Sequence, residues 1–232
     1  MDPSRYGWIA MTSELMKTEL DHIVVAASTL EEGRVWARDV LGVEPSGGGK
    51  HAGISTHNTL IGLNANHYLE IIAVDPDAPA PLVPRWFGLD TLAVKSMIAN
   101  GPRLVAWVAR ASGASNAIEQ FAALPGNPAN VVRPAQRGDF RWRFAFTPDG
   151  ALAGGGALPH LIQWDVPMRP WERLPDVGVS LSSLLVADPQ PESLSAQLSA
   201  LTFVDAKVQV AQSTGAQLVA TLNTPRGMVI LD

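Results

Sequence analysis

The 232-residue chain contains no cysteine, so disulfide bonds, thiolate catalysis and cysteine-ligated zinc sites are excluded. It has no run of like charge and no apolar run of the roughly 18 residues that a membrane-spanning helix needs. Its formal net charge is −5, whereas a nucleic-acid-binding surface would normally show a basic patch. The first residues lack the basic and apolar segments of a signal peptide. These absences predict a cytoplasmic globular protein that binds neither nucleic acid nor membrane.

The clearest local signal that is present is a strand followed directly by a capped helix. Residues 20–27 form an apolar, β-branched run that is interrupted by His22. Ser28 and Thr29 each precede a glutamate by three residues, which is the spacing of a capping box at a helix N-terminus. Gly42 follows as a typical residue at a helix C-terminus. The histidine is therefore predicted to lie on a rigid strand.

The same order of elements recurs along the chain. The helix is followed by a glycine-rich segment that we expect to be a loop, and then by three predicted strands at 50–56, 58–63 and 68–74 with a hairpin turn at 64–66. The order strand, helix, strand, strand, strand recurs over 103–164 and again over 179–231. Such a recurrence indicates a duplicated supersecondary unit. We expect an N-terminal tail at 1–18, paired modules over 19–168, and a third module at 177–232 that packs on them, either as a separate unit or within a single domain.

A repeated βαβββ unit resembles the vicinal oxygen chelate superfamily, which includes glyoxalase I, extradiol dioxygenases and bleomycin-resistance proteins, and most closely its glyoxalase-like branch. The resemblance is carried by Leu20–Ala26, Gly49–Leu60, Tyr68–Pro76 and Leu158–Trp164. It implies an α+β fold in which repeated βαβββ modules form an open, barrel-like mixed sheet cup with helices on the outside. We expect the first two modules to form the cup; an alternative pairs the first module with the third.

The resemblance also implies a divalent metal ion, whose identity the sequence does not give. A histidine on a module's first strand and a glutamate on its last strand are typical ligands in the superfamily, and His22 and Glu70 match those two places. The second module has Ala106 and Gln163 instead. Gln163 or His51 could complete a three-ligand site, and we assign Gln163 to it. Such an ion would polarise a carbonyl or enolate oxygen.

Each candidate residue also has a structural interpretation. His22 could be a hydrogen-bonded strand residue, and Glu70 could be a catalytic base or a partner in a salt bridge. Arg143 shares a strand face with Arg141: a face that points into the cup would suit an anionic substrate, and one that points outward would be an ordinary solvated pair. The residues that we assign to substrate binding are His51, Asn58, Trp86 and Arg143.

The leading hypothesis is a metal-dependent enzyme of this superfamily, a lyase, an isomerase or a dioxygenase, that acts on a small oxygenated organic molecule. In it, Glu70 is the catalytic residue. The alternative is a metal-free protein that binds or sequesters a small ligand, as bleomycin-resistance proteins do, and the missing ligands of the second module favour it. Whether turnover occurs stays open. A homodimer would cover the sheet edge that an unpaired third module leaves.

Overall fold

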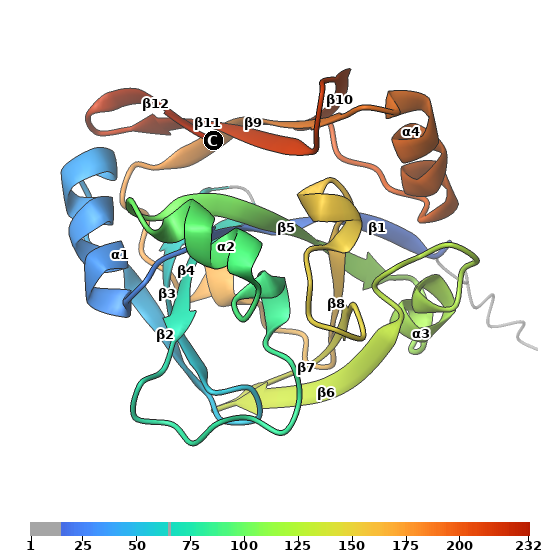
Figure 1. The fold of residues 1–232 in the computed structure, drawn as a ribbon, viewed down its shortest axis with the longest axis horizontal. Helices are drawn as coiled ribbons and strands as arrows, with labels where there is room; N and C mark the ends of the chain where they lie inside the picture. The colour runs from blue at the N-terminus through green and yellow to red at the C-terminus, as the bar shows by residue number, and fades with distance from the viewer. Residues whose placement is uncertain (1–14, 65) are drawn as a thin grey trace, which may run out of the picture.

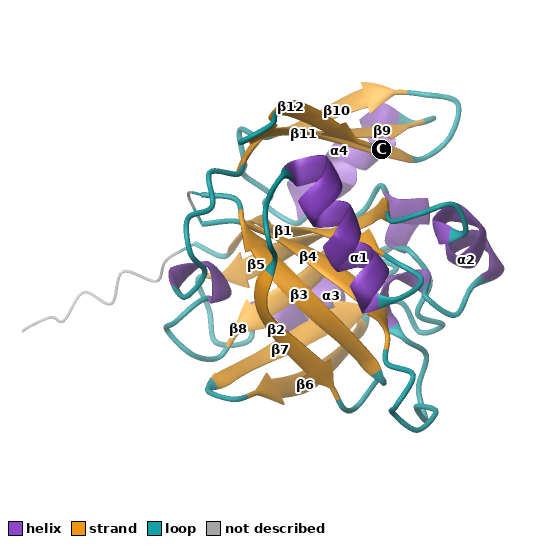
Figure 2. Ribbon diagram, turned by 90° about the vertical axis from the view of Figure 1, so that its left-hand side faces the viewer, coloured by secondary structure: helices purple, strands orange, loops and turns teal. Residues whose placement is uncertain are grey.

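The computed structural model describes residues 15–64 and 66–232, and it shows an eight-stranded mixed sheet curled into a cup below a smaller four-stranded sheet (Figure 1, Figure 2). The first module contains β1 (Lys17–Ala26), α1 (Leu30–Trp36), the π-helical turn η1 (Ala37–Leu41), β2 (Ser46–His51), β3 (Thr56–Gly62) and β4 (Tyr68–Val74). The second contains β5 (Arg103–Ser112), α3 (Ala117–Ala122), β6 (Val131–Arg137), β7 (Phe140–Phe146), η3 (Ala153–Gly156) and β8 (His160–Trp164). The connector between them carries η2 (Trp86–Gly88) and α2 (Leu92–Ile98), and η4 (Pro170–Glu172) follows β8.

The strand order of the cup is β2-β3-β4-β1-β5-β8-β7-β6. In each module the last strand pairs in parallel with the first, β4 with β1 and β8 with β5, while β1 and β5 pair antiparallel and join the modules. The predicted α+β fold, with paired βαβββ modules that form a cup, is therefore confirmed. None of the helices in the described part of the chain is long and apolar enough to cross a membrane.

The helix of the first module begins and ends as the sequence predicts. The Thr29 side chain accepts a hydrogen bond from the Glu32 backbone N–H at 3.1 Å, and the Glu32 carboxylate accepts one from the Ser28 backbone N–H at 3.1 Å. Gly42 ends the helical segment in the left-handed conformation with φ 74°. In the hairpin turn, Asn64 and Asn66 both have positive φ, as their tolerance of that conformation predicts.

The glycine-rich segment that we expected to be a loop belongs to strand β2. Gly48 has φ +81°, and a Cβ there would lie 2.2 Å from the carbonyl oxygen of Asn58 on β3. The Gly49 backbone N–H donates to the Asn58 side-chain oxygen at 2.9 Å. The glycines therefore allow a close approach of two strands that also positions the Asn58 side chain.

The C-terminal segment has the predicted order of elements, but its strands pair differently from those of the first two modules. It contains β9 (Ser180–Asp188), α4 (Pro191–Ala200), β10 (Val208–Gln212), β11 (Gln217–Thr224) and β12 (Gly227–Leu231), in the sheet order β10-β9-β11-β12. Here the strand after the helix, β10, pairs in parallel with the first strand, and β12 lies at the edge. The small sheet is not hydrogen-bonded to the large one and forms a separate layer on the outside of the cup (Figure 1).

The hydrophobic core consists of two clusters, one on the outer side of the large sheet and one on its concave side. The outer cluster joins β1 residues such as Ile23 with α3, α4 and the small sheet, and the inner cluster fills the cup with residues that include Val24, Phe144 and Ile162. The predicted tail lies outside the described residues up to residue 14, and β1 begins before the predicted end of that tail, at Lys17.

Candidate active site

A β-bulge in β1 turns two adjacent side chains toward the inside of the cup. Leu20 pairs with Ala109 and His22 pairs with Val108, so Asp21 is an extra residue in the ladder. The fully buried Asp21 carboxylate accepts hydrogen bonds from His22 Nδ1 at 2.7 Å and from Trp164 Nε1 at 3.0 Å. The sequence reasoning missed Asp21, because strict alternation places neighbouring residues on opposite faces and a bulge leaves no trace in the alternation.

His22 and Glu70 meet inside the cup. Their strands pair in parallel, and His22 Nε2 lies 3.4 Å from Glu70 Oε2. Asn58 on β3 donates its side-chain amide to the other Glu70 oxygen at 2.5 Å. The Tyr68 ring stacks on the His22 ring with centroids 4.4 Å apart. His22 and Glu70 are only 3% and 6% exposed, so their charges interact with little screening from solvent.

The electrostatics of this pair favour two opposite charges. Burial lowers the pKa of His22, but its hydrogen bonds and charge interactions with Asp21 and Glu70 outweigh burial and raise the pKa to about 9. Burial raises the pKa of Glu70, but its contact with His22 outweighs burial and holds the pKa below its usual value. At neutral pH the site therefore contains an imidazolium between two carboxylates.

A second polar group, on β2, β3 and β6, adjoins the pair. Arg137 Nη1 donates to Asn58 Oδ1 at 2.9 Å and to His51 Nε2 at 3.3 Å. The other His51 nitrogen bonds the Thr56 hydroxyl at 2.9 Å. Burial, helped by the nearby Arg137 charge, lowers the pKa of His51 to about 4, so this histidine is neutral. Sequence reasoning missed Arg137, which has no carboxylate within ion-pair distance among the described residues.

Two adjoining cavities give access to these side chains. The inner one has a volume of about 30 Å³, about that of one water molecule in the liquid, and it is lined by His22, Glu70, Asn58, Arg137 and aromatic side chains. The outer one has a volume of about 550 Å³. His51, Trp86 and Trp142 line both cavities. Of the residues that we predicted to bind substrate, His51, Asn58 and Trp86 therefore lie at the cavities.

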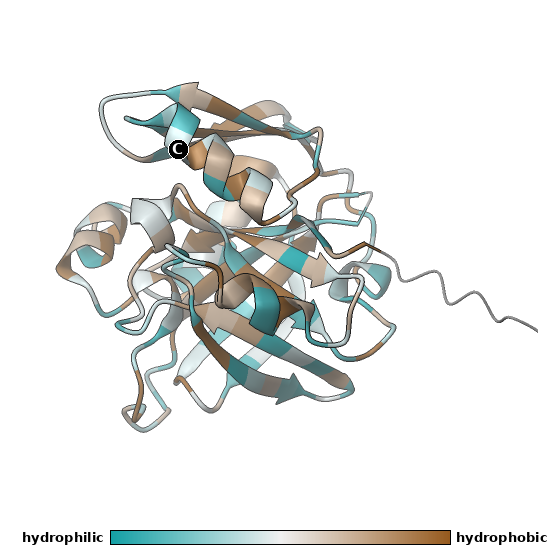
Figure 3. Cartoon of the chain, turned by 90° about the vertical axis from the view of Figure 1, so that its right-hand side faces the viewer, coloured by the Kyte–Doolittle hydropathy of each residue, from teal (hydrophilic) through white to brown (hydrophobic). Residues whose placement is uncertain are grey.

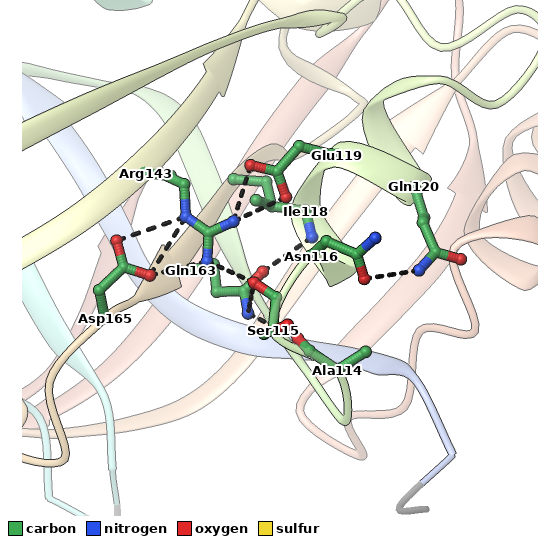
Figure 4. Close-up of polar contacts among 9 residues, drawn as sticks. All are labelled: Ala114, Ser115, Asn116, Ile118, Glu119, Gln120, Arg143, Gln163 and Asp165. Atoms are coloured by element: carbon green, nitrogen blue, oxygen red, sulfur yellow. Dashed lines mark hydrogen bonds and ion pairs between the residues drawn. The ribbon is translucent and has the colours of Figure 1, made fainter.

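Gln163 and Arg143 lie elsewhere, beside α3 (Figure 4). The Gln163 side chain accepts from the backbone N–H of Ile118 at 2.8 Å and donates to the carbonyl of Ala114 at 2.7 Å. Arg143 forms ion pairs with Glu119 and Asp165, both at 2.7 Å. On each strand the residues on either side, Trp142 and Phe144 or Ile162 and Trp164, are the ones that line the inner cavity. Period-two alternation therefore turns Gln163 and Arg143 away from the cup, and the three-ligand set with Gln163 is not assembled.

The donors at the pair do not form a complete metal site. The residues that the structure describes contain no group of three or more His, Asp or Glu side chains placed to hold a metal ion. His22 and Glu70 offer two donors, whereas strands β7 and β8 of the second module line the cavity with Ile162, Trp164 and other apolar or aromatic side chains. The Arg137 charge beside Asn58 adds electrostatic repulsion toward a cation. The residues present therefore do not fit a preformed divalent metal site.

A third histidine, His160, lies on the concave side one strand beyond β5. It pairs with Val108, the residue that also pairs with His22, and its ring stacks on Phe144 with centroids 5.8 Å apart. It is 1% exposed, and neither ring nitrogen has a hydrogen-bond partner among the residues that the structure describes. Burial lowers the pKa of His160 to about 4, so it is a neutral, buried ring.

Comparison with known proteins identifies this architecture. The model of the family described as "Glyoxalase-like domain" matches residues 20–202. The chain belongs to the glyoxalase-like family. This confirms the predicted relationship to the glyoxalase and vicinal oxygen chelate superfamily, and it makes the first two modules together with β9 and α4 the family domain. The comparison with curated protein sequences finds no match.

Solved structures share the fold of this family member. A hypothetical protein from Staphylococcus aureus has a TM-score of 0.58 at 11% identity, and the alignment covers 86% of this chain and 88% of that one. The Mn(II)-bound glyoxalase from Novosphingobium aromaticivorans has a TM-score of 0.50 at 11% identity, with coverage of 93% and 82%. At these identities the similarity establishes the fold alone, so the chemistry has to be argued from this chain's own site.

Proposed function

We propose that this glyoxalase-like protein is an enzyme that moves a proton on a small oxygenated organic substrate, with Glu70 as the base. The observation that carries the proposal is the buried contact of His22 with Glu70 at the end of a substrate-sized pair of cavities. A base and a proton donor within reach of one another are the minimum for abstraction of a proton next to a carbonyl group.

The chemistry requires the substrate to enter between the two side chains. Its carbonyl oxygen would take the place of Glu70 at His22 Nε2, and the proton on the adjacent carbon would face Glu70. Glu70 would then lose the contact that lowers its pKa, and burial would make it a stronger base. As Glu70 takes the proton and becomes a neutral acid, the negative charge that develops on the substrate oxygen would be held by the His22 and Arg137 N–H groups. Return of the proton to the same place is the reverse step, which exchanges the hydrogen with solvent, whereas its delivery to a different carbon of the enolate system, or to the opposite face of the same carbon, completes an isomerisation.

Deuterium exchange in D2O tests this step without knowledge of the full reaction. We expect the protein to accelerate exchange of the C–H adjacent to the carbonyl in at least one member of a panel of 2-oxo acids, followed by NMR. Glu70→Gln should lower the exchange rate by at least about 100-fold, because it removes the base and keeps the side chain's shape. Glu119→Gln is the matched control, since Glu119 lies on the opposite side of the sheet. Equal rates in the wild type and Glu70→Gln would refute the proposal.

Metal dependence is the competing form of the same enzyme. Its support is the match of His22 and Glu70 to the superfamily's ligand positions, and against it stand the missing further donors. Elemental analysis of the purified protein, with exchange measured before and after treatment with EDTA, separates the two. Exchange that survives chelation supports proton transfer by side chains alone. About one divalent ion per chain, together with loss of exchange when EDTA removes that ion, supports the metal enzyme.

The metal-free binding protein is the second candidate function. Both Glu70 oxygens have partners, Asn58 and His22, and the inner cavity is small, so a ligand held in the outer cavity alone would leave Glu70 without a reacting group. Tight binding of a small molecule without exchange in any panel member would favour it. Cytoplasmic location and homodimer formation stay predictions.

A further inference from the structure

The outer cavity is a candidate for the part of the ligand that does not react. Its volume of about 550 Å³ is within the range of small-molecule sites. Its walls combine apolar residues, including Ile54, Val83, Trp86 and Trp142, with residues 133–136 of the edge strand β6. The inner cavity, at about 30 Å³, has room only for a small reacting group. A ligand that reaches Glu70 therefore leaves most of its body in the outer cavity.

The positive charges at the two cavities are uncompensated. Half of the twelve arginines in the described part of the chain form ion pairs with carboxylates, namely Arg34, Arg38, Arg85, Arg110, Arg143 and Arg173. Arg133, which lines the outer cavity, forms no ion pair with another described residue, and its guanidinium lies 5.5 Å over the ring of Phe146. The same holds for Arg137 at the inner cavity, whose partners are neutral.

Further residues at the outer cavity leave this charge in place. Asp165, its one acidic lining residue, is bound to Arg143 at 2.7 Å. His51 is neutral, because burial lowers its pKa to about 4. Arg141 lines the same cavity and also has no ion-pair partner among the residues described. In a chain with a formal net charge of −5, this cavity therefore carries local positive charge that favours an anion.

Register along β6 sets the spacing of the two charges. Arg133 pairs with Phe144 and Arg137 pairs with Phe140, so the two arginines are four positions apart and share one face of the strand, which lines the two cavities. Four residues of strand span about 13 Å. Figure 3 shows hydrophilic and hydrophobic segments side by side on the strands of the large sheet. An apolar surface, including Ala135 and Trp142, lies between the two charges.

We propose that the substrate is an elongated organic anion whose carboxylate binds Arg133, whose apolar body fills the outer cavity, and whose oxygen-bearing end reaches Arg137 and Glu70. This inference rests on the proposed function, because it assigns the reacting end of the ligand to Glu70. It narrows the substrate to molecules with a negative group remote from the reacting carbon. Arg133 is here a specificity-determining residue that takes no part in proton transfer.

Calorimetric titration with straight-chain acids tests the spacing. The probes are α,ω-dicarboxylates from about 6 to about 14 carbons, which bracket the ~13 Å between the two arginines, and the monocarboxylates of the same lengths. We expect the longer dicarboxylates to bind at least about tenfold more tightly than the matched monocarboxylates, because a second charge-assisted hydrogen bond forms. Arg133→Gln should abolish that difference, and Arg133→Lys should retain part of it. Arg103→Gln, an exposed arginine on β5 outside both cavities, is the control.

Equal affinity for the two series at every length, no binding of either series, or a difference that survives Arg133→Gln would each overturn the inference. The proposed function fails or stands by a separate measurement. Glu70→Gln should keep the preference for dicarboxylates while it loses exchange. Exchange without the dicarboxylate preference would refute the inference and leave the proposed function in place. The dicarboxylate preference without exchange would refute the proposed function and leave the role of Arg133 in anion binding in place.

Discussion

The buried histidines predict that the free energy of unfolding has a maximum near pH 6.5. His22 has its pKa raised to about 9, whereas His51 and His160 have theirs lowered to about 4, all from an ordinary value of 6.5. A pKa that differs between the folded and unfolded chain makes stability depend on pH. The two groups of histidines act on opposite sides of pH 6.5, so they can be measured separately.

On the alkaline side the controlling residue is His22. The folded chain holds its proton more tightly than the unfolded chain, so the stabilisation is fully present below pH 6.5 and is lost as the pH rises through about 9. The interval from 6.5 to about 9 corresponds to about 3 kcal/mol. For a domain of this size, such a loss lowers the melting temperature by roughly 6–12 °C.

On the acidic side the controlling residues are His51 and His160. Both are neutral in the folded chain, because burial disfavours their charged form, and they take up protons more readily when unfolded. Their stabilisation is therefore present above pH 6.5 and is lost as the pH falls toward about 4. Each contributes up to about 3 kcal/mol over that interval. Carboxylates such as Glu70, whose pKa is lowered, add a loss of the same sign at still lower pH.

Urea denaturation at closely spaced pH values, in the wild type and two variants, tests the reasoning. His22→Gln should be less stable at pH 6.5 and should show little change in stability between pH 6.5 and 9. His160→Phe places an apolar ring among aromatic neighbours, so it should reduce the loss below pH 6.5 and leave the alkaline side unchanged. A wild-type stability that is flat between pH 6.5 and 9, or a His22→Gln curve parallel to the wild type there, would refute the assignment of an imidazolium to this site.

Three further substitutions probe the scaffold. Gly48→Ala should destabilise the chain by about 1–3 kcal/mol more than Gly126→Ala in urea denaturation, because both glycines have φ +81° but only the Cβ at Gly48 would meet backbone, 2.2 Å from an oxygen; equal losses would mean that the close approach of β2 to β3 is not needed. Gly33→Ala should cost about 1–3 kcal/mol, since its Cβ would lie 2.4 Å from the side chain of Ile71 and push α1 off the sheet, and a Tm unchanged in calorimetry would contradict this. Arg143→Gln should lower stability by about 1 kcal/mol or less and leave ligand binding in calorimetric titration unchanged, because its partly exposed ion pairs lie away from the cavities; weakened binding would contradict this.

The cup could be predicted from the sequence because local signals and repetition agreed. The capping residues of α1, Gly42 at the end of η1, and the asparagines of the β3–β4 turn each act within a few residues of chain. The pairing of the third module could not be predicted in this way. Its order of elements is that of the other two, and the choice between β10 and β12 as the parallel neighbour of β9 depends on packing against the cup, which no local pattern encodes.

The residues of the candidate site could be predicted from the sequence only where the side chains of a strand alternate regularly between its two faces. Alternation places His22 and Glu70 on the concave face, and the structure brings them together. Alternation also turns Gln163 outward. For this residue, the match to the superfamily's ligand position was therefore a poorer guide than the alternation of side chains along the strand. Asp21 was missed because a bulge suspends the alternation for one residue. Arg137 was missed because its partners come from β2 and β3, far away in sequence.

The two modules contribute different kinds of side chain to the same site. The first module supplies the acid, the base and Asn58, whereas the second supplies Arg137 from β6 and a wall of apolar and aromatic side chains from β7 and β8. That wall still acts on the chemistry through one atom: the Trp164 N–H on β8 holds the Asp21 carboxylate, which in turn fixes the proton on His22 Nδ1 and leaves Nε2 facing Glu70. A tryptophan at this place therefore couples the second module to the orientation of the histidine in the first. No group of three metal donors is assembled among the described residues, which is consistent with a site in which hydrogen bonds to Asp21 and Glu70 set the protonation state of His22.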